Sequence, residues 1–408
     1  MVKKWFFVSF LNLFIAGILG FILRILQYYS INFPYSNFLH THSHIAMLGW
    51  LYQIFYILIY LYFIPKSKKN QSLYSTLFWI TQLSIVGMFV SFPFQGYGLY
   101  SILFSTLHIL CSYYFCYLTF KNLRQKDIST LFIKTALACM LFSTFGIWGL
   151  GITMGTLGKS SILYSICIQF FLHFQINGWF LLGCFALILK VLDINYSLIY
   201  SKITYIFYIL VLLGIIFSFG LPLSWFIHSQ YIYFSYCFGI ICNIAFLFLF
   251  LRFIHPYLLA LIQSKSLSLQ LLYSFFFLSL LLKVIIQLFL FNPEIAQYSY
   301  EIKNLRIGFI HLETLGIYTC LSFILLMLHN NWIDSKSKLI KMGTLFFLGF
   351  YFISEVLLFL QGSFIYLGKN IIPNYFFILS WSSLLFPLGI LFYLIYIIIF
   401  QKPSKNNS

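Results

Sequence analysis

The sequence predicts an all-α, polytopic membrane protein, and three observations predict this class. Hydrophobic residues make up 62% of the 408 residues and charged residues only 8%, whereas a soluble domain carries about 25% charged residues. Apolar runs of roughly 20 residues, long enough to cross a bilayer as a helix, recur along the whole chain. No long hydrophilic insert separates them. We therefore expect one integral membrane domain over residues 1–408.

Twelve apolar segments are expected to be helices, because a backbone in lipid must satisfy its hydrogen bonds internally. The predicted spans are about 5–28, 38–63, 73–94, 99–120, 129–153, 162–190, 203–223, 230–253, 268–291, 306–328, 339–360 and 374–400. The first resembles a signal peptide but lacks a small-x-small cleavage site, so we keep it as a span. Residues 401–408 are expected to form a short cytoplasmic tail.

The basic residues predict the orientation of these spans. The formal charge is +17, but Lys and Arg are scattered between the apolar runs and form no continuous patch for nucleic acid. With the N-terminus inside, the inner segments hold 17 Lys and Arg, and the outer loops hold only Lys159, Lys303, Arg306 and Lys369. The positive-inside rule then places both termini in the cytoplasm. The expected partner is the lipid bilayer, not nucleic acid.

Seven of the nine histidines are expected at one depth, in the outer part of the membrane. They are His40, His42 and His44 at the outer end of the second span, His108 in the fourth, His173 in the sixth, His311 in the tenth and His228 in the loop after the seventh. His40 and His44 share a helix face, and His42 points away from it by about 160°. Neutral imidazole commonly binds haem iron and copper, so this gathering indicates a candidate site.

Three of these histidines begin the same pattern, H-x-x-x-x-G, on every fourth span. The patterns run from His44 to Gly49, from His173 to Gly178 and from His311 to Gly316, so the histidines are 129 and 138 residues apart. The glycine would admit either a flat macrocycle or a neighbouring helix. The spacing predicts three related four-helix units, and a site between such repeats is common. The predicted units cover about 1–128, 129–260 and 261–400.

Two carboxylates also fall inside predicted spans. Glu313 follows His311 by two residues, and Glu355 lies in the eleventh span. Such groups need partners in a membrane. They are candidates for a proton relay or for orienting an imidazole. The alternative is a structural ion pair with Lys283 or Arg24.

The topology and two of the motifs resemble catalytic subunit I of the haem–copper oxidase superfamily, nearest its cbb-type oxidases and nitric oxide reductases. FLHTHSHIAMLGW resembles the family's second span, and HFQINGWF is similar to its sixth-span motif, whose histidine binds copper. The resemblance implies three four-helix arcs and a low-spin haem b held by His311 and one of His40, His42 or His44. Copper or a second haem would face His173. It also implies a bacterial inner membrane, and partner subunits or a cytochrome electron donor.

Two departures from that family are visible. The seventh span, ITYIFYILVLLGIIFSFGLPL, lacks the family's adjacent copper-binding histidines, and in the tenth span Phe309 precedes His311 where the family has a further histidine. The NnrS family, twelve-span haem and copper proteins linked to nitric oxide metabolism, also resembles the chain in its H-x-H-x-x-x-x-G segment. Members of the NnrS family also lack the complete ligand set of the oxidases.

We therefore expect a haem-binding membrane protein that transfers electrons to oxygen or nitric oxide. The preferred axial ligands are His44 and His311, with His40 and His42 as further candidates, and His173 and His108 are candidate metal ligands. Two alternatives stay open: a degenerate subunit with a structural haem, and a metal- or proton-coupled transporter that depends on its histidines.

Overall fold

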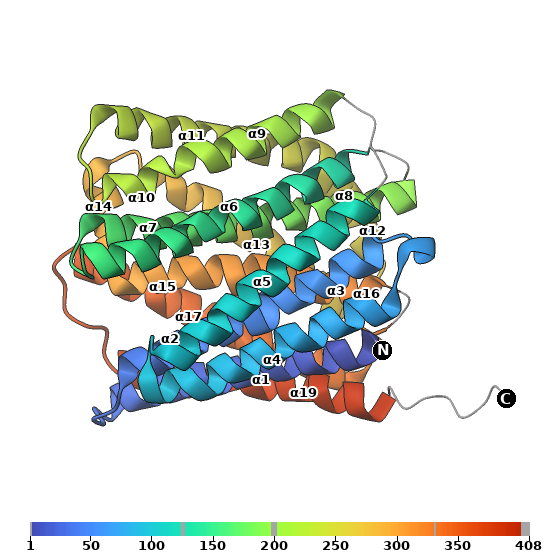
Figure 1. Cartoon of the computed structure of the whole chain (residues 1–408), viewed down its shortest axis with the longest axis horizontal. Coiled ribbons are helices and arrows are strands. Elements are labelled where there is room, and N and C mark those ends of the chain that lie inside the picture. The colour runs from blue at the N-terminus through green and yellow to red at the C-terminus, as the bar shows by residue number, and fades with distance from the viewer. Residues whose placement is uncertain (1, 124–126, 197–201, 330–331, 401–408) are drawn as a thin grey trace. The chain divides into compact units, whose positions relative to one another are not determined.

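The computed structural model describes residues 2–123, 127–196, 202–329 and 332–400, and within these ranges the chain forms helices and no strand (Figure 1). Twelve helices in this part are long and apolar enough to cross a membrane, which confirms the predicted class. The chain is an integral membrane protein whose solvent is lipid. The orientation of the termini stays a prediction, and the predicted tail 401–408 lies outside the described residues.

We number the membrane-crossing helices spans 1 to 12 in chain order. Spans 1, 3, 4, 5, 9 and 11 are single α-helices: α1 (Val2–Tyr28), α4 (Gln71–Gln95), α5 (Leu99–Asn122), α6 (Ile128–Thr156), α13 (Leu267–Phe289) and α17 (Lys338–Tyr366). Spans 7 and 12 each join two α-helices: α9 (Lys202–Ser218) with α10 (Gly220–Ser224), and α18 (Tyr375–Ser382) with α19 (Leu385–Phe400).

The other four spans each contain a π-helical segment between two α-helices. Span 2 is α2 (Tyr35–His44), η1 (Ile45–Tyr52) and α3 (Gln53–Tyr62); span 6 is α7 (Ile162–His173), η3 (Phe174–Phe180) and α8 (Leu181–Tyr196); span 8 is α11 (Gln230–Leu249), η4 (Phe250–Ile254) and α12 (His255–Gln263); span 10 is α15 (Lys303–His311), η5 (Leu312–Thr319) and α16 (Cys320–Leu328). Two short elements lie outside the spans: η2 (Lys66–Lys68) and α14 (Pro293–Glu301).

The largest difference from the prediction is at the end of span 8. We predicted that this span ends near residue 253, whereas the helix continues to Gln263. The span continues through Pro256, which lies in the first turn of α12 directly after the π segment η4. A second difference is α14, which Asn292 caps by accepting from the backbone N–H of Glu294 at 2.9 Å.

The three spans that carry the H-x-x-x-x-G pattern are the most buried. In spans 2, 6 and 10, 72%, 94% and 72% of the most apolar 18-residue window is buried, against 33–50% in the other nine. Large apolar side chains such as Phe145, Ile152 and Phe248 are more than 60% exposed on the outer faces of α6 and α11. These outer faces suit contact with lipid chains, and the pattern-bearing spans are covered by protein.

The chain divides into two compact units, and unit 1 comprises Met1–Phe115, Lys265–Phe276 and Thr314–Ser408. In its core, Phe10 of α1 packs on Trp50, Phe323 and Tyr393, with ring centroids 5.2–5.5 Å apart. The indole N–H of Trp50 donates to the hydroxyl of Thr319 at 2.9 Å. Span 2 thus packs within unit 1 on α1 and on the part of span 10 that begins at residue 314.

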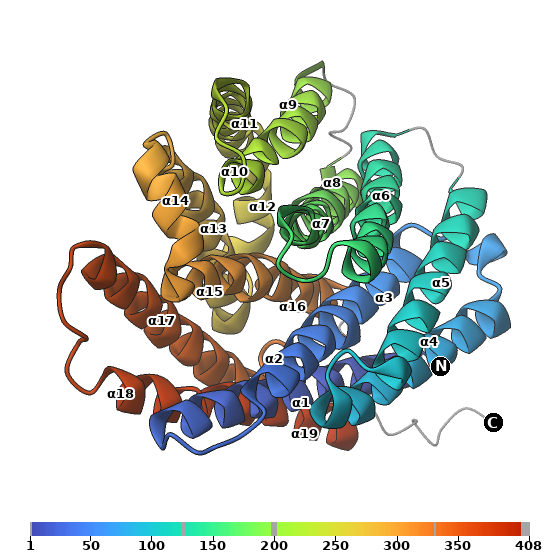
Figure 2. The same cartoon turned by 60° about the vertical axis from the view of Figure 1, so that its left-hand side comes forward.

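Unit 2 comprises Cys116–Ser264 and Phe277–Glu313. Helices α9 and α11 lie side by side in it, as Figures 1 and 2 show, and α6 packs against α7 and α8. Phe185 of α8 is buried in this unit, with its ring 5.0 Å from Phe207 and 5.8 Å from Phe246. The predicted division into three four-helix repeats stays a prediction.

Candidate functional site

Each histidine of the repeated pattern is directly followed by a π-helical segment. His44, His173 and His311 are the last residues of α2, α7 and α15, and η1, η3 and η5 begin at the next residue. The pattern's glycine lies in the π segment each time. π-Helical segments are rare and frequently lie at functional sites. The sequence pattern therefore corresponds to a repeated backbone geometry.

The glycine of the pattern admits a neighbouring helix in two of the three cases. A Cβ atom built on Gly49 would lie 3.2 Å from Asn12 Cβ and from Ile85 Cγ2. A Cβ on Gly178 would lie 2.7 Å from Cys139 Cβ. Asn12 also donates its side-chain N–H to the carbonyl of Gly49 at 2.9 Å, which gives this buried carbonyl a partner inside the π segment.

In unit 1, His40 and His44 face α4. The Nδ1–H of His44 donates to the carbonyl of His40 at 2.8 Å. The ring of His44 lies 4.4 Å from that of Phe92. The ring of His40 lies 4.7 Å from that of Tyr97, just beyond α4.

His42 faces the opposite side of the same helix, as its spacing predicts. Its Nδ1–H donates to the carbonyl of Ala16 in α1 at 2.9 Å. A Cβ atom on Gly20 would lie 3.1 Å from Cε1 of His42, so the glycine leaves room for the imidazole ring. Span 2 therefore presents imidazoles to α1 on one face and to α4 on the other.

The hydrogen bonds from His42 and His44 to backbone carbonyls are of the kind that a haem-binding histidine makes. A metal-binding histidine almost always donates its second ring N–H to a carbonyl or carboxylate, which fixes the tautomer and leaves the other nitrogen for the metal. His42 and His44 both meet this requirement within unit 1, because Nδ1 is bound to a backbone carbonyl and Nε2 is left over. The residues present on span 2 thus suit an axial ligand of haem iron.

His108 on α5 is the most deeply buried histidine of unit 1. It is 3% exposed, and its Nε2 atom has no hydrogen-bond partner among the described residues. Its ring lies edge-on to the ring of Tyr52 in η1, with centroids 4.7 Å apart. An unsatisfied buried polar group costs about 1–3 kcal/mol, so native proteins rarely keep one without a ligand or a role.

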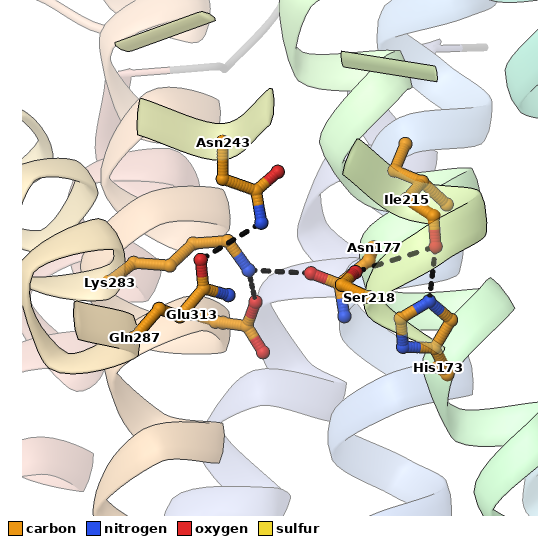
Figure 3. A network of polar contacts seen from close by, with 8 residues as sticks. All are labelled: His173, Asn177, Ile215, Ser218, Asn243, Lys283, Gln287 and Glu313. Carbon is orange, nitrogen blue, oxygen red and sulfur yellow. Dashed lines mark hydrogen bonds and ion pairs between the residues drawn. The ribbon is translucent and has the colours of Figure 1, made fainter. Parts of the chain in front are cut away.

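In unit 2, His173 has a protein partner instead. Its Nε2–H donates to the carbonyl of Ile215 in α9 at 2.8 Å (Figure 3). His228, the histidine nearest in sequence to span 7, is exposed in the loop after α10. No group of three or more His, Cys, Asp or Glu side chains in the described residues is arranged to hold a metal ion. The residues of this part do not fit the three-histidine copper centre of the haem–copper oxidases.

A buried ion pair lies beside His173 in the same unit. The ammonium of Lys283 donates to a carboxylate oxygen of Glu313 and to the side-chain oxygen of Asn177 (Figure 3). The side chains of Lys283 and Glu313 are only 1% and 3% exposed. Glu313 belongs to η5 and Asn177 to η3, so one lysine of α13 joins two π segments. The structure thus contains the Lys283 partner that we named as the alternative for Glu313.

Two further buried amides extend the polar part of unit 2. Asn243 of α11 donates to Gln287 of α13 at 2.9 Å (Figure 3). We did not predict either residue, although an intramembrane amide is a usable signal because it needs a partner in lipid. Gln287 lies one helical turn beyond Lys283.

Glu355 in span 11 lies near Arg24, the second of the named ion-pair partners. Arg24 donates to the hydroxyl of Ser354, the residue before Glu355, at 3.0 Å. Glu355 is 8% exposed. All three residues belong to unit 1. Nothing in this geometry carries a proton path to a histidine, so the relay role of Glu355 stays a prediction.

His311 is half-buried at the end of α15 and belongs to unit 2, whereas His40, His42 and His44 belong to unit 1. Their pairing on one haem stays a prediction from the resemblance. No protein-family model matches the chain, and no curated protein matches it. The function must therefore be inferred from the residues themselves.

Proposed function

We propose that the chain is a haem-binding integral membrane protein, related in kind to haem–copper oxidase subunit I, whose work is electron transfer. The observation that supports this most is the pair of imidazoles on span 2, because His42 and His44 each bind a backbone carbonyl through Nδ1 and keep Nε2 available in a partly buried helix. His311 is the proposed second ligand. A bound haem b would supply reversible one-electron chemistry of its iron.

The residues of span 2 would perform three tasks toward that haem. The carbonyls of Ala16 and His40 fix the tautomer and the orientation of the imidazoles. The buried apolar side chains Ile45, Ile85, Met88 and Phe92 form one core cluster of unit 1, which keeps water away and lowers the local dielectric. The two faces of the helix allow only one of the two histidines to face a given haem.

The described residues favour electron transfer without a haem–copper pair. The described part of span 7 supplies no histidine, and Nε2 of His173 is bound to Ile215. We therefore propose single-electron transfer through the haem, to oxygen, nitric oxide or a partner, without a haem–copper pair. An NnrS-like protein of nitric oxide metabolism belongs to the same proposal.

The test is a reduced-minus-oxidised spectrum of the purified chain from a haem-replete host. We expect a low-spin b-type signal that is lost in His311→Ala and in one of His42→Ala or His44→Ala. His228→Ala is the matched control, because this exposed histidine is expected to leave the spectrum unchanged. Wild-type protein without any Soret band would refute the proposal.

A proton-coupled transporter is the second candidate, and the Lys283–Glu313 pair favours it. A buried carboxylate that exchanges a proton while a lysine stays nearby is a common element of ion-coupled transport. Proteoliposomes with an imposed pH gradient would test this. Proton flux that disappears in Glu313→Gln, in protein that never carries haem, would favour the transporter.

A further inference from the structure

An open groove lies on the surface of unit 1, near the ends of the spans that the charge distribution predicts to be cytoplasmic. It has a volume of about 350 Å³ and is lined by residues of α1, α4 and α19. Lys3 and Lys4 supply its charged groups, and its apolar lining includes Val8 of α1, Trp79 of α4 and Ile398 of α19. All of these residues belong to unit 1.

The packing of α1 explains why the groove is apolar and open. Helix α1 lies along α19 (Figure 1), and Trp5 of α1 stacks on Phe78 of α4 with ring centroids 5.0 Å apart. The next residue, Trp79, does not share this buried face and is 42% exposed. Ile398 is 58% exposed. Large apolar side chains therefore line a surface that is open to lipid.

The two lysines give the groove a positive charge that no carboxylate balances. Lys3 and Lys4 are exposed, and none of the described residues that line the groove is acidic. The two ion pairs found in the described part of the chain involve neither lysine. Lysine side chains at the end of a span extend along apolar surface to the membrane interface, where lipid phosphates lie. The groove is thus apolar along its length and basic at one end.

This combination matches a phospholipid better than a partner protein. Basic pockets between membrane helices on the cytoplasmic side bind anionic headgroups. A partner's transmembrane helix would contact α1 across the hydrocarbon core, which is about 30 Å thick. The groove takes in only residues 3–8 of α1, which span roughly 8 Å along the helix axis.

We propose that this groove selectively binds an anionic phospholipid. An acyl chain lies against Val8, Trp79 and Ile398, and the headgroup phosphate binds Lys3 and Lys4. Selection follows from charge, because a zwitterionic lipid offers the lysines a phosphate whose charge its own ammonium cancels. The assignment goes beyond the proposed haem and does not depend on it.

The test uses the full chain reconstituted in phosphatidylcholine vesicles with a small fraction of a phospholipid whose acyl chains are brominated, because bromine quenches tryptophan fluorescence on contact. The signal of Trp79 is the difference between each protein and its Trp79→Phe counterpart. We expect brominated phosphatidylglycerol to quench this signal at a fraction at least about fivefold below that of brominated phosphatidylcholine, since one lysine near an anionic headgroup contributes about 1 kcal/mol. The preference should disappear in Lys3→Gln/Lys4→Gln.

Three variants show whether charge and space in the groove cause the preference. Lys3→Arg/Lys4→Arg keeps both charges and should keep the preference, which separates loss of charge from loss of the fold. Lys338→Gln/Lys341→Gln is the matched control, because it removes two exposed lysines of α17 that are predicted on the same side of the membrane. Val8→Phe should weaken quenching by both lipids, because the larger side chain occupies part of the groove.

Several outcomes would overturn the proposal. These are equal quenching by the two brominated lipids in wild type, a preference that survives Lys3→Gln/Lys4→Gln, and a preference that disappears in the Arg variant or in Lys338→Gln/Lys341→Gln. Quenching of Trp79 by neither lipid would also overturn it and would indicate a protein subunit retained in the groove. A wild-type chain without haem would leave the lipid result standing.

Discussion

The side chains around the H-x-x-x-x-G pattern have different hydrogen-bond partners in the two units. In unit 1, imidazoles and the amide of Asn12 lie beside η1, and among the described residues His44 and His108 each retain a ring nitrogen without a protein partner. In unit 2, the polar side chains of η3 and η5 already bind one another, because Lys283 joins Asn177 to Glu313 and Ile215 binds His173. Among the described residues, the π-helical segment of unit 1 therefore has imidazole nitrogens without a hydrogen-bond partner near it. The side chains near the π-helical segments of unit 2 are hydrogen-bonded.

This difference bears on the proposed function. A metal or haem needs ligand atoms that the protein does not already use, and unit 1 offers them. A buried ion pair in lipid, by contrast, stabilises or couples charge, since separating its members exposes an uncompensated charge. Under the proposed function, the imidazoles of span 2 in unit 1 are offered to a haem, whereas the ion-paired network of unit 2 has a structural or proton-coupling role.

Breaking the ion pair of unit 2 should have the largest effect. Lys283→Met leaves Glu313 without its partner in a buried position, which costs about 3–5 kcal/mol of unfolding free energy. The double variant Lys283→Met/Glu313→Leu should recover most of this loss, because no charge stays buried. Unfolding in mixed micelles measures both. Equal stability of Lys283→Met and wild type would show that the network is not a structural element.

Substitution of the pattern's glycines compares how tightly neighbouring helices pack against the π segments of the two units. Gly178→Ala should destabilise by about 1–3 kcal/mol, because its Cβ would come within 2.7 Å of Cys139 Cβ. Gly49→Ala should cost less, since its nearest contacts are 3.2 Å away. Gly151→Ala is the control, because a Cβ there meets nothing within 4 Å. The cost of Gly178→Ala should shrink when Cys139→Gly is added, and an unchanged cost would contradict the contact.

A third prediction concerns an ion pair at the end of a span. Lys190 lies 3.1 Å from Asp127, which also caps α6 by accepting from the backbone N–H of Thr130 at 2.7 Å. Burial acts to raise the pKa of Asp127, but the hydrogen bonds from Thr130 and the ammonium of Lys190 outweigh it and hold the pKa below 3.8. The ionised carboxylate therefore stabilises the fold above that pH, and this contribution is lost as the pH falls through the lower folded pKa.

Asp127→Asn keeps the cap and removes the charge, so it isolates the ion pair. We expect a loss of about 1–2 kcal/mol between pH 5 and 7 that diminishes below about pH 4. Thermal melts of both proteins across this range measure the difference. A gap that widens in acid would reverse the sign of the argument.

The smallest effect should come from the amide network of unit 1. Asn12 donates to the carbonyl of Gly49 and to the side chain of Gln82, each at 2.9 Å. Asn12→Leu should cost about 1 kcal/mol, because hydrogen bonds between membrane helices are individually weak. The same melts compare it with Lys283→Met. If Asn12→Leu lost as much unfolding free energy as Lys283→Met, the neutral network of unit 1 would contribute as much as the charged network of unit 2, against our expectation.

The spans were predictable and the sites were not, for different physical reasons. A span is specified by about 20 local residues, so its position is visible in the chain, and the largest error is the end of span 8, which lies at Gln263. The helix faces of His42 and His44 were also predictable, since a helix places residues two apart on opposite sides. Most hydrogen-bond partners were not: Ile215 and Asn177 come from different spans that no local pattern relates, and Lys283 was predicted only as one of two alternative ion-pair partners.

The sequence by itself determined the membrane, the twelve helices and the repeated H-x-x-x-x-G pattern, because hydropathy and helical periodicity act over short distances along the chain. Only the tertiary structure decided which groups the imidazoles of HTHSHIAMLGW and of the other spans contact. The carbonyl of Ala16 accepts a hydrogen bond from His42, and the carbonyl of Ile215 accepts one from Nε2 of His173. Nε2 of His108 has no hydrogen-bond partner among the described residues. A hydrogen bond depends on which helices pack together, and that choice is made by the whole fold.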